Sequence, residues 1–551
     1  MLKSRVALAT AVLALAFSAP GAARGDDGKD HQHHHARPEK LGTITFPISC
    51  APGSQAPFAR GVALLHSFWY AEAEKAFAAV AAADPGCAMA HWGVAMSLYH
   101  PIWAGPTPAE MARGRAAVEK AVAAGPRTER EKAYVAAVES FFKDAETVDH
   151  RTRALAYEAA MARVHEQYPD DREAAIFHAL AMLGTASPTD KTYANQKKAA
   201  AILNRVLPQQ PDHPGVAHYL IHSFDYPQLA ELALTAARSY SKIAESSPHA
   251  LHMPSHIFVR LGLWDDSIRA NEDSAAAALA HVRKSDPGAT AFDELHALDY
   301  LAYAFLQQGR DEKAREILER VRAVVRLDNE QFAAAYALAA VPARFALERG
   351  RWADASALEV TPAWFPWAKF PFAEAITHHA RAIGAARSGD APRAREAVAR
   401  LGALHRAAVD AKIGYWPDPI EIQRREAAAW LAMAEGRKDE AVSLMKEAVA
   451  LEESIEKHPV TPGPVLPARE LEGDLLMALG RPAEALAAYE ASLAVAPNRF
   501  YALGAAVRAA DAAGRRDTAR THFATLEKVT ARADGSRAEL GKLKAIAAGR
   551  K

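Results

Sequence analysis

The chain has 551 residues, of which half are hydrophobic, and its 66 basic and 66 acidic residues give a formal net charge of zero. This balance leaves no basic stripe, so it argues against nucleic acid or an anionic membrane as the partner. The length is compatible with several domains or with a repeat array that grows without closing.

The first 23 residues read as a secretory leader. MLKSR is a short basic start, VALATAVLALAFSA is apolar but too short to span a bilayer, and small residues follow around Ala22 and Ala23. We therefore expect an exported protein, periplasmic or secreted. The alternative is an uncleaved anchor, but no stop-transfer pattern follows. No later segment is long and apolar enough to suggest a membrane span.

Residues 24–45 have the composition of a polar, disordered arm. The arm carries a histidine-rich tract, which either collects transition metals or is simply a solvated tail. The histidines are His31, His33, His34 and His35.

Cys50 and Cys87 are the only cysteines. In an exported protein two cysteines usually pair, and we expect a disulfide between them. Two free thiols, or a soft copper site with Met89 nearby, are the alternatives.

From about Phe58 onward the sequence predicts amphipathic helices of 12–15 residues, separated by short breaks. Some breaks are of the type ADPG (83–86) and YPDD (168–171), and others are Gly-Arg pairs such as Gly309-Arg310 and Gly480-Arg481. We divide the helical part into N-terminal repeats (46–150), central repeats (151–330) and C-terminal repeats (331–545). Three insertions interrupt the pattern: WFPWAKFPF (364–372), GYWPDP (414–419) and KHPVTPGPVLP (457–467). The last either folds back into the array or only joins two repeats.

The segment GRPAEALAAYEASLAVAPN (480–498) resembles the second helix and closing turn of a tetratricopeptide repeat, and GRDEKAREILERV (309–321) and GRKDEAVSLMKEAV (436–449) have the same form. The resemblance covers most of the chain after the arm and is looser between about 100 and 210. It implies an all-α solenoid, a right-handed superhelix of tandem helical hairpins. It also implies a concave groove, which in this family holds peptide or protein ligands.

Two His-x-x-x-His pairs lie 34 residues apart, His218/His222 and His252/His256. Histidines at i and i+4 share one face of a helix, and 34 is the length of one repeat. Stacked repeats should therefore bring four imidazoles together. Pro254 breaks the helical pattern inside the second pair, so a helix should start or kink there.

By the register of the repeat family, these four positions face the groove, as do His296, Asp299 and Tyr303 of the next repeat and His379 further on. The predicted metal ligands are His218, His222, His252, His256, His296 and Asp299. Neutral histidines with one carboxylate suit zinc, copper or iron. Candidates for the outer partners of the ligands are Asp225, Glu294, Ser255 and Asn271. A polar groove for an organic or peptide ligand, or a structural hydrogen-bond ladder, would use the same histidines.

These patterns favour an exported solenoid with a transition-metal site in its groove. If the site is catalytic, Asp299 and Tyr303 are the acid–base candidates. The alternative is a non-catalytic scaffold that binds a peptide or protein partner. A hydrolase that uses His and Asp without metal is a third hypothesis, but no nucleophile motif such as Gly-x-Ser-x-Gly supports it.

Overall fold

Alanine-rich amphipathic segments form helices along nearly the whole chain in the computed structural model, which describes residues 39–102 and 105–549. The leader and the histidine-rich tract lie outside the described residues. From Lys40 onward the described helices pack into a single unit. Among the described residues, no helix is both long and apolar enough to cross a membrane.

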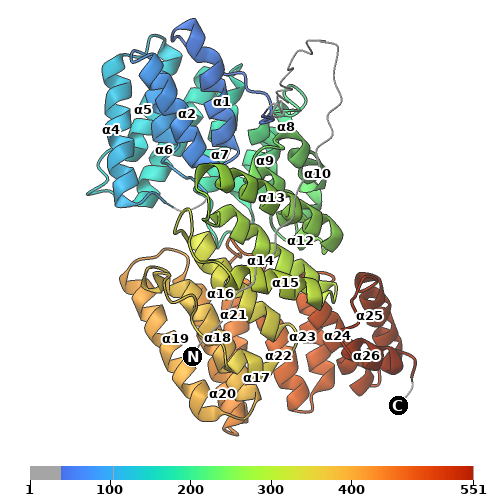
Figure 1. The fold of residues 1–551 in the computed structure, drawn as a ribbon. Coiled ribbons are helices and arrows are strands. Elements are labelled where there is room, and N and C mark those ends of the chain that lie inside the picture. Colours follow the sequence, from blue (N-terminus) through green and yellow to red (C-terminus); the bar gives the residue numbers. More distant parts are fainter. Residues whose placement is uncertain (1–38, 103–104, 550–551) are drawn as a thin grey trace, which may run out of the picture. The chain divides into compact units, whose positions relative to one another are not determined.

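The N-terminal helices pack mainly against their neighbours in sequence (Figure 1). They are α1 (Gln55–His66), α2 (Tyr70–Ala83), α3 (Ala88–Met96), α4 (Pro108–Ala124), α5 (Glu129–Phe142), α6 (His150–Gln167), α7 (Arg172–Gly184), α8 (Ala194–Val206) and α9 (Pro214–Phe224), with the short 3-10 helix η1 (Pro52–Ser54) before them. α1 also packs against α9, so the first hairpin contacts the helix that carries His218 and His222.

The central helices begin with a break at the second histidine pair. They are η2 (Ala230–Ala233), α10 (Leu234–Ile243), α11 (Pro248–His252), α12 (Pro254–Arg260), α13 (Trp264–Ser285), α14 (Phe292–Gln307), α15 (Asp311–Arg322), α16 (Phe332–Leu347) and α17 (Trp352–Ser356). Pro254 is the first residue of α12, a position where the missing N–H costs nothing. The helix therefore restarts at Pro254, as the sequence suggested.

The C-terminal helices continue the hairpins to the end of the described chain. They are η3 (Trp367–Lys369), α18 (Pro371–Arg387), α19 (Ala391–Asp410), α20 (Pro417–Ala434), α21 (Lys438–Ser454), α22 (Ala468–Ala478), α23 (Pro482–Val495), α24 (Phe500–Ala512), α25 (Arg516–Val529) and α26 (Glu539–Ala547). Gly309 and Gly480 of the predicted Gly-Arg breaks have φ of 66° and 71°. Glycine adopts this left-handed conformation without strain, so these residues end one helix and allow the next to turn back.

The C-terminal hairpins also contact the central ones. α14 packs against α24, and the Trp264 indole N–H donates to the Asn498 carbonyl at 2.9 Å. Arg537 forms a buried ion pair with Asp311 (2.9 Å). Contacts between residues more than 200 positions apart thus join the end of the chain to its middle.

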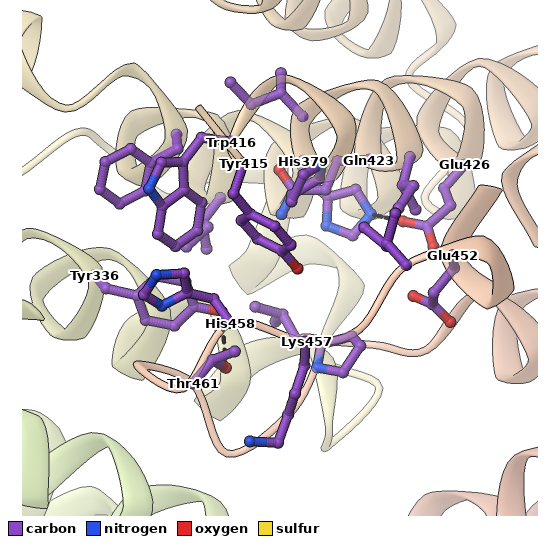
Figure 2. Close-up of a pocket in the computed structure, with 18 of the residues that line it drawn as sticks. Tyr336, His379, Tyr415, Trp416, Gln423, Glu426, Glu452, Lys457, His458 and Thr461 are labelled. Atoms are coloured by element: carbon purple, nitrogen blue, oxygen red, sulfur yellow. Dashed lines mark hydrogen bonds and ion pairs between the residues drawn. The ribbon is translucent and has the colours of Figure 1, made fainter. Parts of the chain in front are cut away.

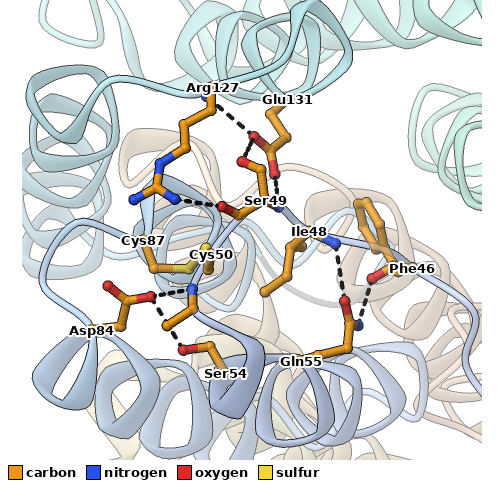
Figure 3. The surroundings of a disulfide bond; sticks show 11 residues. Phe46, Ile48, Ser49, Cys50, Ser54, Gln55, Asp84, Cys87, Arg127 and Glu131 are labelled. Carbon is orange, nitrogen blue, oxygen red and sulfur yellow. Dashed lines mark hydrogen bonds between the residues drawn. A yellow bond between two sulfur atoms is a disulfide. The ribbon is translucent and has the colours of Figure 1, made fainter.

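The first ordered segment is tied to the N-terminal helices by the predicted disulfide (Figure 3). Cys50 and Cys87 are bonded, with an S–S distance of 2.01 Å and a Cα–Cα distance of 5.0 Å. Leu41 and Phe46 are buried, and the Thr43 N–H donates to the Asp212 carbonyl at 3.0 Å. Residues 40–45, which the sequence assigned to a disordered arm, are therefore ordered, because they contribute to the core.

Candidate metal centre

The four histidines of the two predicted pairs are all buried and lie close together. On α9, His218 Nε2 and His222 Nε2 are 3.1 Å apart. His252, at the end of α11, and His256, on α12, are separated by the helix break, yet their Nε2 atoms are 3.0 Å apart. The rings of His222 and His256 have centroids 6.1 Å apart. The repeat spacing therefore placed both pairs correctly.

Each pair is joined by a third histidine. His249 completes one group with His218 and His222, and His296 completes the other with His252 and His256; in each group the potential ligand atoms lie within 4.8 Å of one another. His296 was predicted from its place in the next repeat. His249 was not predicted, because Gly215 occupies the position 34 residues earlier.

The imidazoles of His218, His252 and His256 are each oriented by an acceptor on Nδ1. His218 Nδ1 lies 2.7 Å from the His66 carbonyl, and His256 Nδ1 lies 3.0 Å from Asp225 Oδ2. His252 Nδ1 lies 2.6 Å from Asn271 Oδ1, and the Asn271 amide nitrogen donates to the Ser267 carbonyl at 2.8 Å, which sets the orientation of the amide. All three partners accept, so each Nδ1 must carry the proton and each Nε2 presents a lone pair.

With both protons on Nδ1, the Nε2 atoms of His252 and His256 face each other without a proton between them. Two bare Nε2 atoms 3.0 Å apart repel each other unless a proton or a cation lies between them. Burial, together with the neighbouring His296 and His256, holds the pKa of His252 well below its usual range, which disfavours the proton. Zn–N bonds of about 2.0–2.1 Å place two ligand nitrogens about 2.9–3.4 Å apart for N–Zn–N angles between about 90° and 109°. The second group therefore fits a metal ion.

The first group can satisfy itself without a metal. If His222 carries its proton on Nε2, it donates one hydrogen bond to His218 Nε2 across the 3.1 Å gap. Burial lowers the pKa of His218 to about 3, so both rings remain neutral at physiological pH. The two groups thus differ: His218 and His222 can form a hydrogen bond with each other, whereas the Nε2 lone pairs of His252 and His256 point at each other.

Asp225 and Asn271 occupy the outer positions that the sequence suggested for them. Asp225 bridges His256 to two cations, Arg260 Nε at 2.8 Å and Lys457 Nζ at 3.1 Å. Burial opposes ionisation, but Lys457 and Arg260 hold the pKa of Asp225 well below its usual range. Glu294 instead binds Arg320 at 2.7 Å, so it does not act as an outer partner.

Asp299 and Tyr303 are not brought to the histidines. Asp299 Oδ1 accepts from Arg344 Nε at 2.9 Å, and the Tyr303 hydroxyl accepts from Arg499 Nη1 at 2.8 Å. Asp299 does not belong to the groups of potential ligands found among the described residues. Arg344 lies on α16, which packs against α14, and Arg499 is the residue before α24. These arginine contacts compete with a role for Asp299 as a ligand or for either residue as an acid–base group.

A third buried group contains a carboxylate and two histidines. Glu173 lies 2.9 Å from His66 Nε2 and 2.9 Å from His213 Nε2, and His66 Nδ1 lies 2.8 Å from the Tyr219 hydroxyl. Burial raises the pKa of Glu173, but His213 and His66 outweigh it and lower that pKa to about 2. Because the carboxylate accepts from both imidazoles, this group forms a structural hydrogen-bond ladder. It connects to the metal candidates through the His66 carbonyl.

The predicted insertion at 457–467 folds back over the histidine groups, and does not merely join two repeats. Lys457 Nζ reaches Asp225, and the Tyr300 hydroxyl donates to the Pro459 carbonyl at 3.1 Å. Tyr300 itself packs against His252, with ring centroids 4.6 Å apart. Arg344 donates to the Gly463 carbonyl at 2.7 Å. The segment 455–467 therefore covers the side of the site formed by α14.

Comparison with known proteins supports the repeat fold. Residues 467–499, which include all of α22 and α23, match the family model described as the tetratricopeptide repeat. The chain therefore contains a tetratricopeptide repeat, and its described helical hairpins form an α-solenoid. No curated protein matches the sequence.

Three solved structures show a distant likeness. A tetratricopeptide repeat protein from Parabacteroides merdae is 12% identical over 55% of this chain and 99% of its own, with a TM-score of 0.28. The Cut9–Hcn1 hetero-tetramer of the APC/C is 11% identical over 89% of both chains (TM-score 0.31). The human IFIT1 dimer with m7Gppp-AAAA is 9% identical over 81% of this chain and 90% of that one (TM-score 0.37).

Proposed function

We propose that this protein binds a transition-metal ion through the Nε2 atoms of His252 and His256 and a ring nitrogen of His296. The observation that carries the proposal is the 3.0 Å separation of two Nε2 lone pairs whose Nδ1 protons are held by Asn271 and Asp225. Histidine ligands in metal sites usually donate their second nitrogen to such an acceptor, which fixes the ring and raises its basicity.

The three imidazole ligands limit which metal ions the site can bind. Three neutral imidazoles suit zinc, copper(II) or iron(II), whereas calcium and magnesium require oxygen ligands. The histidines are buried, and the segment 455–467 covers them. An ion held there is therefore shielded from solvent, and exchange of the ion requires this segment to move.

Metal analysis of protein purified without a tag tests the proposal. Residues 26–37 should be deleted in a parallel preparation, so that ions collected by the histidine-rich tract are excluded. We expect one equivalent of a first-row metal in both preparations and its loss in His256→Ala. His281→Ala is the matched control, because that histidine has an exposed fraction of 35% and lies outside all three buried groups.

The first group provides a second comparison. His218→Ala removes one histidine of the group that can satisfy itself, and we expect the metal content to be unchanged. If no metal is retained after reconstitution with zinc, copper and iron, the proposal is wrong. A partner-binding scaffold, as the tetratricopeptide match would suggest, then becomes the better explanation.

We also propose that the mature protein is exported. The basic and apolar leader and the Cys50–Cys87 disulfide support this, since disulfides persist in oxidising compartments. Mass spectrometry of the secreted or periplasmic protein should give a mature chain that starts close to residue 24. A full-length chain retained in the cytoplasm would contradict export.

A further inference from the structure

A cavity of about 100 Å³ lies between α18, α20 and the segment 455–467, beside the metal candidates but built from other residues (Figure 2). One wall is aromatic, and the rings of Phe372 and Trp416 stack there with centroids 3.9 Å apart. Tyr336 and Tyr415 complete this wall. A somewhat larger apolar cavity, of about 150 Å³, holds benzene in another protein. This one accommodates a group of about five heavy atoms.

The opposite wall presents hydrogen-bond acceptors. Glu426 is buried, with an exposed fraction of 1%, and its Oε1 has no hydrogen-bond partner in the part of the chain that the structure describes. The same holds for Oε1 of Gln423, one turn earlier on α20. His379 Nε2 lies 2.8 Å from the other oxygen of Glu426. Glu452, on α21, adds a second carboxylate to the same wall.

His379 contacts Glu426, but burial lowers the pKa of His379 to about 4, so its imidazole is neutral at physiological pH and does not balance the two carboxylates. Lys457 lines the cavity, but its Nζ is bound to Asp225 at 3.1 Å and points away from Glu426 and Glu452 in Figure 2. Burial, together with the nearby Glu426, raises the pKa of Glu452 to about 8. An isolated buried carboxylate costs several kcal/mol, so such groups either stay protonated or are compensated by a cation.

We propose that this cavity binds a small organic cation, with an alkylammonium group between Glu426 and Glu452 and its alkyl chain against Trp416. An ammonium supplies three N–H donors, which matches a wall that offers mainly acceptors. Carboxylates bind it through charge-assisted hydrogen bonds, and aromatic rings attract cations. A metal ion is a poorer fit, because neither glutamate belongs to the clusters of potential metal ligands among the described residues.

Calorimetry on the full chain tests the proposal with three cations: butylammonium, tetramethylammonium and 1,4-diaminobutane. The neutral comparison is 1-butanol, which has the same number of heavy atoms as butylammonium. We expect saturable binding of at least one cation, and binding of 1-butanol that is weaker than that of butylammonium by about tenfold or more.

Charge-neutralising variants locate the site. Glu426→Gln should weaken cation binding by about tenfold or more, and Glu452→Gln should weaken it in the same direction. The matched control is Glu453→Gln, because this neighbouring glutamate has an exposed fraction of 53% and lies outside the cavity. Trp416→Leu provides an independent variant if Glu426→Gln does not fold.

Three outcomes overturn the proposal. Equal binding of 1-butanol and butylammonium would show that charge is not recognised. Unchanged cation affinity in Glu426→Gln and Glu452→Gln would place the cation elsewhere. No binding of any of the three cations at about 10 mM would show that the cavity does not take an organic cation. Because His252→Ala leaves the cavity lining intact, amine binding in that variant separates this proposal from the metal site.

Discussion

Asn271→Leu removes the acceptor that fixes the His252 tautomer while retaining a side chain of similar size. The Asn271 oxygen accepts the His252 Nδ1 proton at 2.6 Å, and its nitrogen donates to the Ser267 carbonyl at 2.8 Å. Without this acceptor, His252 can shift its proton to Nε2, the atom proposed to bind the metal. Loss of such an outer partner typically weakens metal affinity by about 10–100-fold, or about 1.4–2.7 kcal/mol.

Competition with a chromophoric zinc chelator measures this loss. Asn271→Asp keeps an acceptor at the same place, so we expect its zinc affinity to equal or exceed that of the wild type. Ser274→Ala is the matched control on the same helix. Its hydroxyl is also buried and donates to the Pro248 carbonyl at 2.8 Å, but it touches none of the proposed ligands.

The order of affinities is the decisive result. Asn271→Asp and Ser274→Ala should bind zinc with an affinity close to that of the wild type, and Asn271→Leu should bind it clearly more weakly. If Asn271→Leu binds zinc within about threefold of the wild type, the Nδ1 acceptor does not prepare His252 as a ligand, and the tautomer argument fails. Equal losses in Asn271→Leu and Ser274→Ala would indicate general damage to the helix.

Three further predictions concern stability. Cys50→Ser with Cys87→Ser should lower the free energy of unfolding by about 3–4 kcal/mol in urea titrations, because the bond closes a 37-residue span; no change would contradict the pairing. Burial, with nearby His165, lowers the pKa of His178 to about 4. As the pH falls below 6.5, His178 is protonated in the unfolded chain before it is protonated in the folded one, and the wild type loses stability. Between pH 7.5 and 5, the free energy of unfolding of His178→Leu should therefore fall by about 2 kcal/mol less than that of the wild type. Arg344 binds both Asp299 and the Gly463 carbonyl, so Arg344→Met should lower the free energy of unfolding by about 3–5 kcal/mol and make the segment 455–467 sensitive to limited proteolysis. Unchanged protease resistance would show that another contact holds the segment.

The helices and their turns were predictable because their signals are local. Amphipathic alanine-rich stretches and Gly-Arg breaks lie within a few residues of the structure that they specify, and Gly309 and Gly480 adopt the left-handed turn that such breaks require. The helix start at Pro254 was also predictable, because proline is disfavoured in a helix interior but accepted at its start. The return of the insertion at 457–467 was not predictable, since Lys457 meets Asp225 across 232 positions.

The histidine pairs were predictable for a similar reason. A 34-residue repeat copies position as well as fold, so His218 and His252 were expected on matching faces. His249 was missed because it has no counterpart one repeat earlier, although it precedes His252 by three residues and this spacing alone places it on the same helix face. Asp299 was expected beside the histidines because the register of the family places it near His296, but Arg344, 45 positions away, binds it instead.

The chemistry of the site depends more on the outer partners than on the repeated histidines. The repeat determines which imidazoles face one another, and both pairs end with Nε2 atoms about equally far apart, 3.1 and 3.0 Å. Only the second pair has acceptors on both Nδ1 atoms, and these come from separate elements: Asn271 from α13 and Asp225 from the segment after α9. The two duplicated motifs therefore differ through contacts that the repeat does not copy: the first pair can form a hydrogen bond, whereas in the second pair two Nε2 lone pairs face each other.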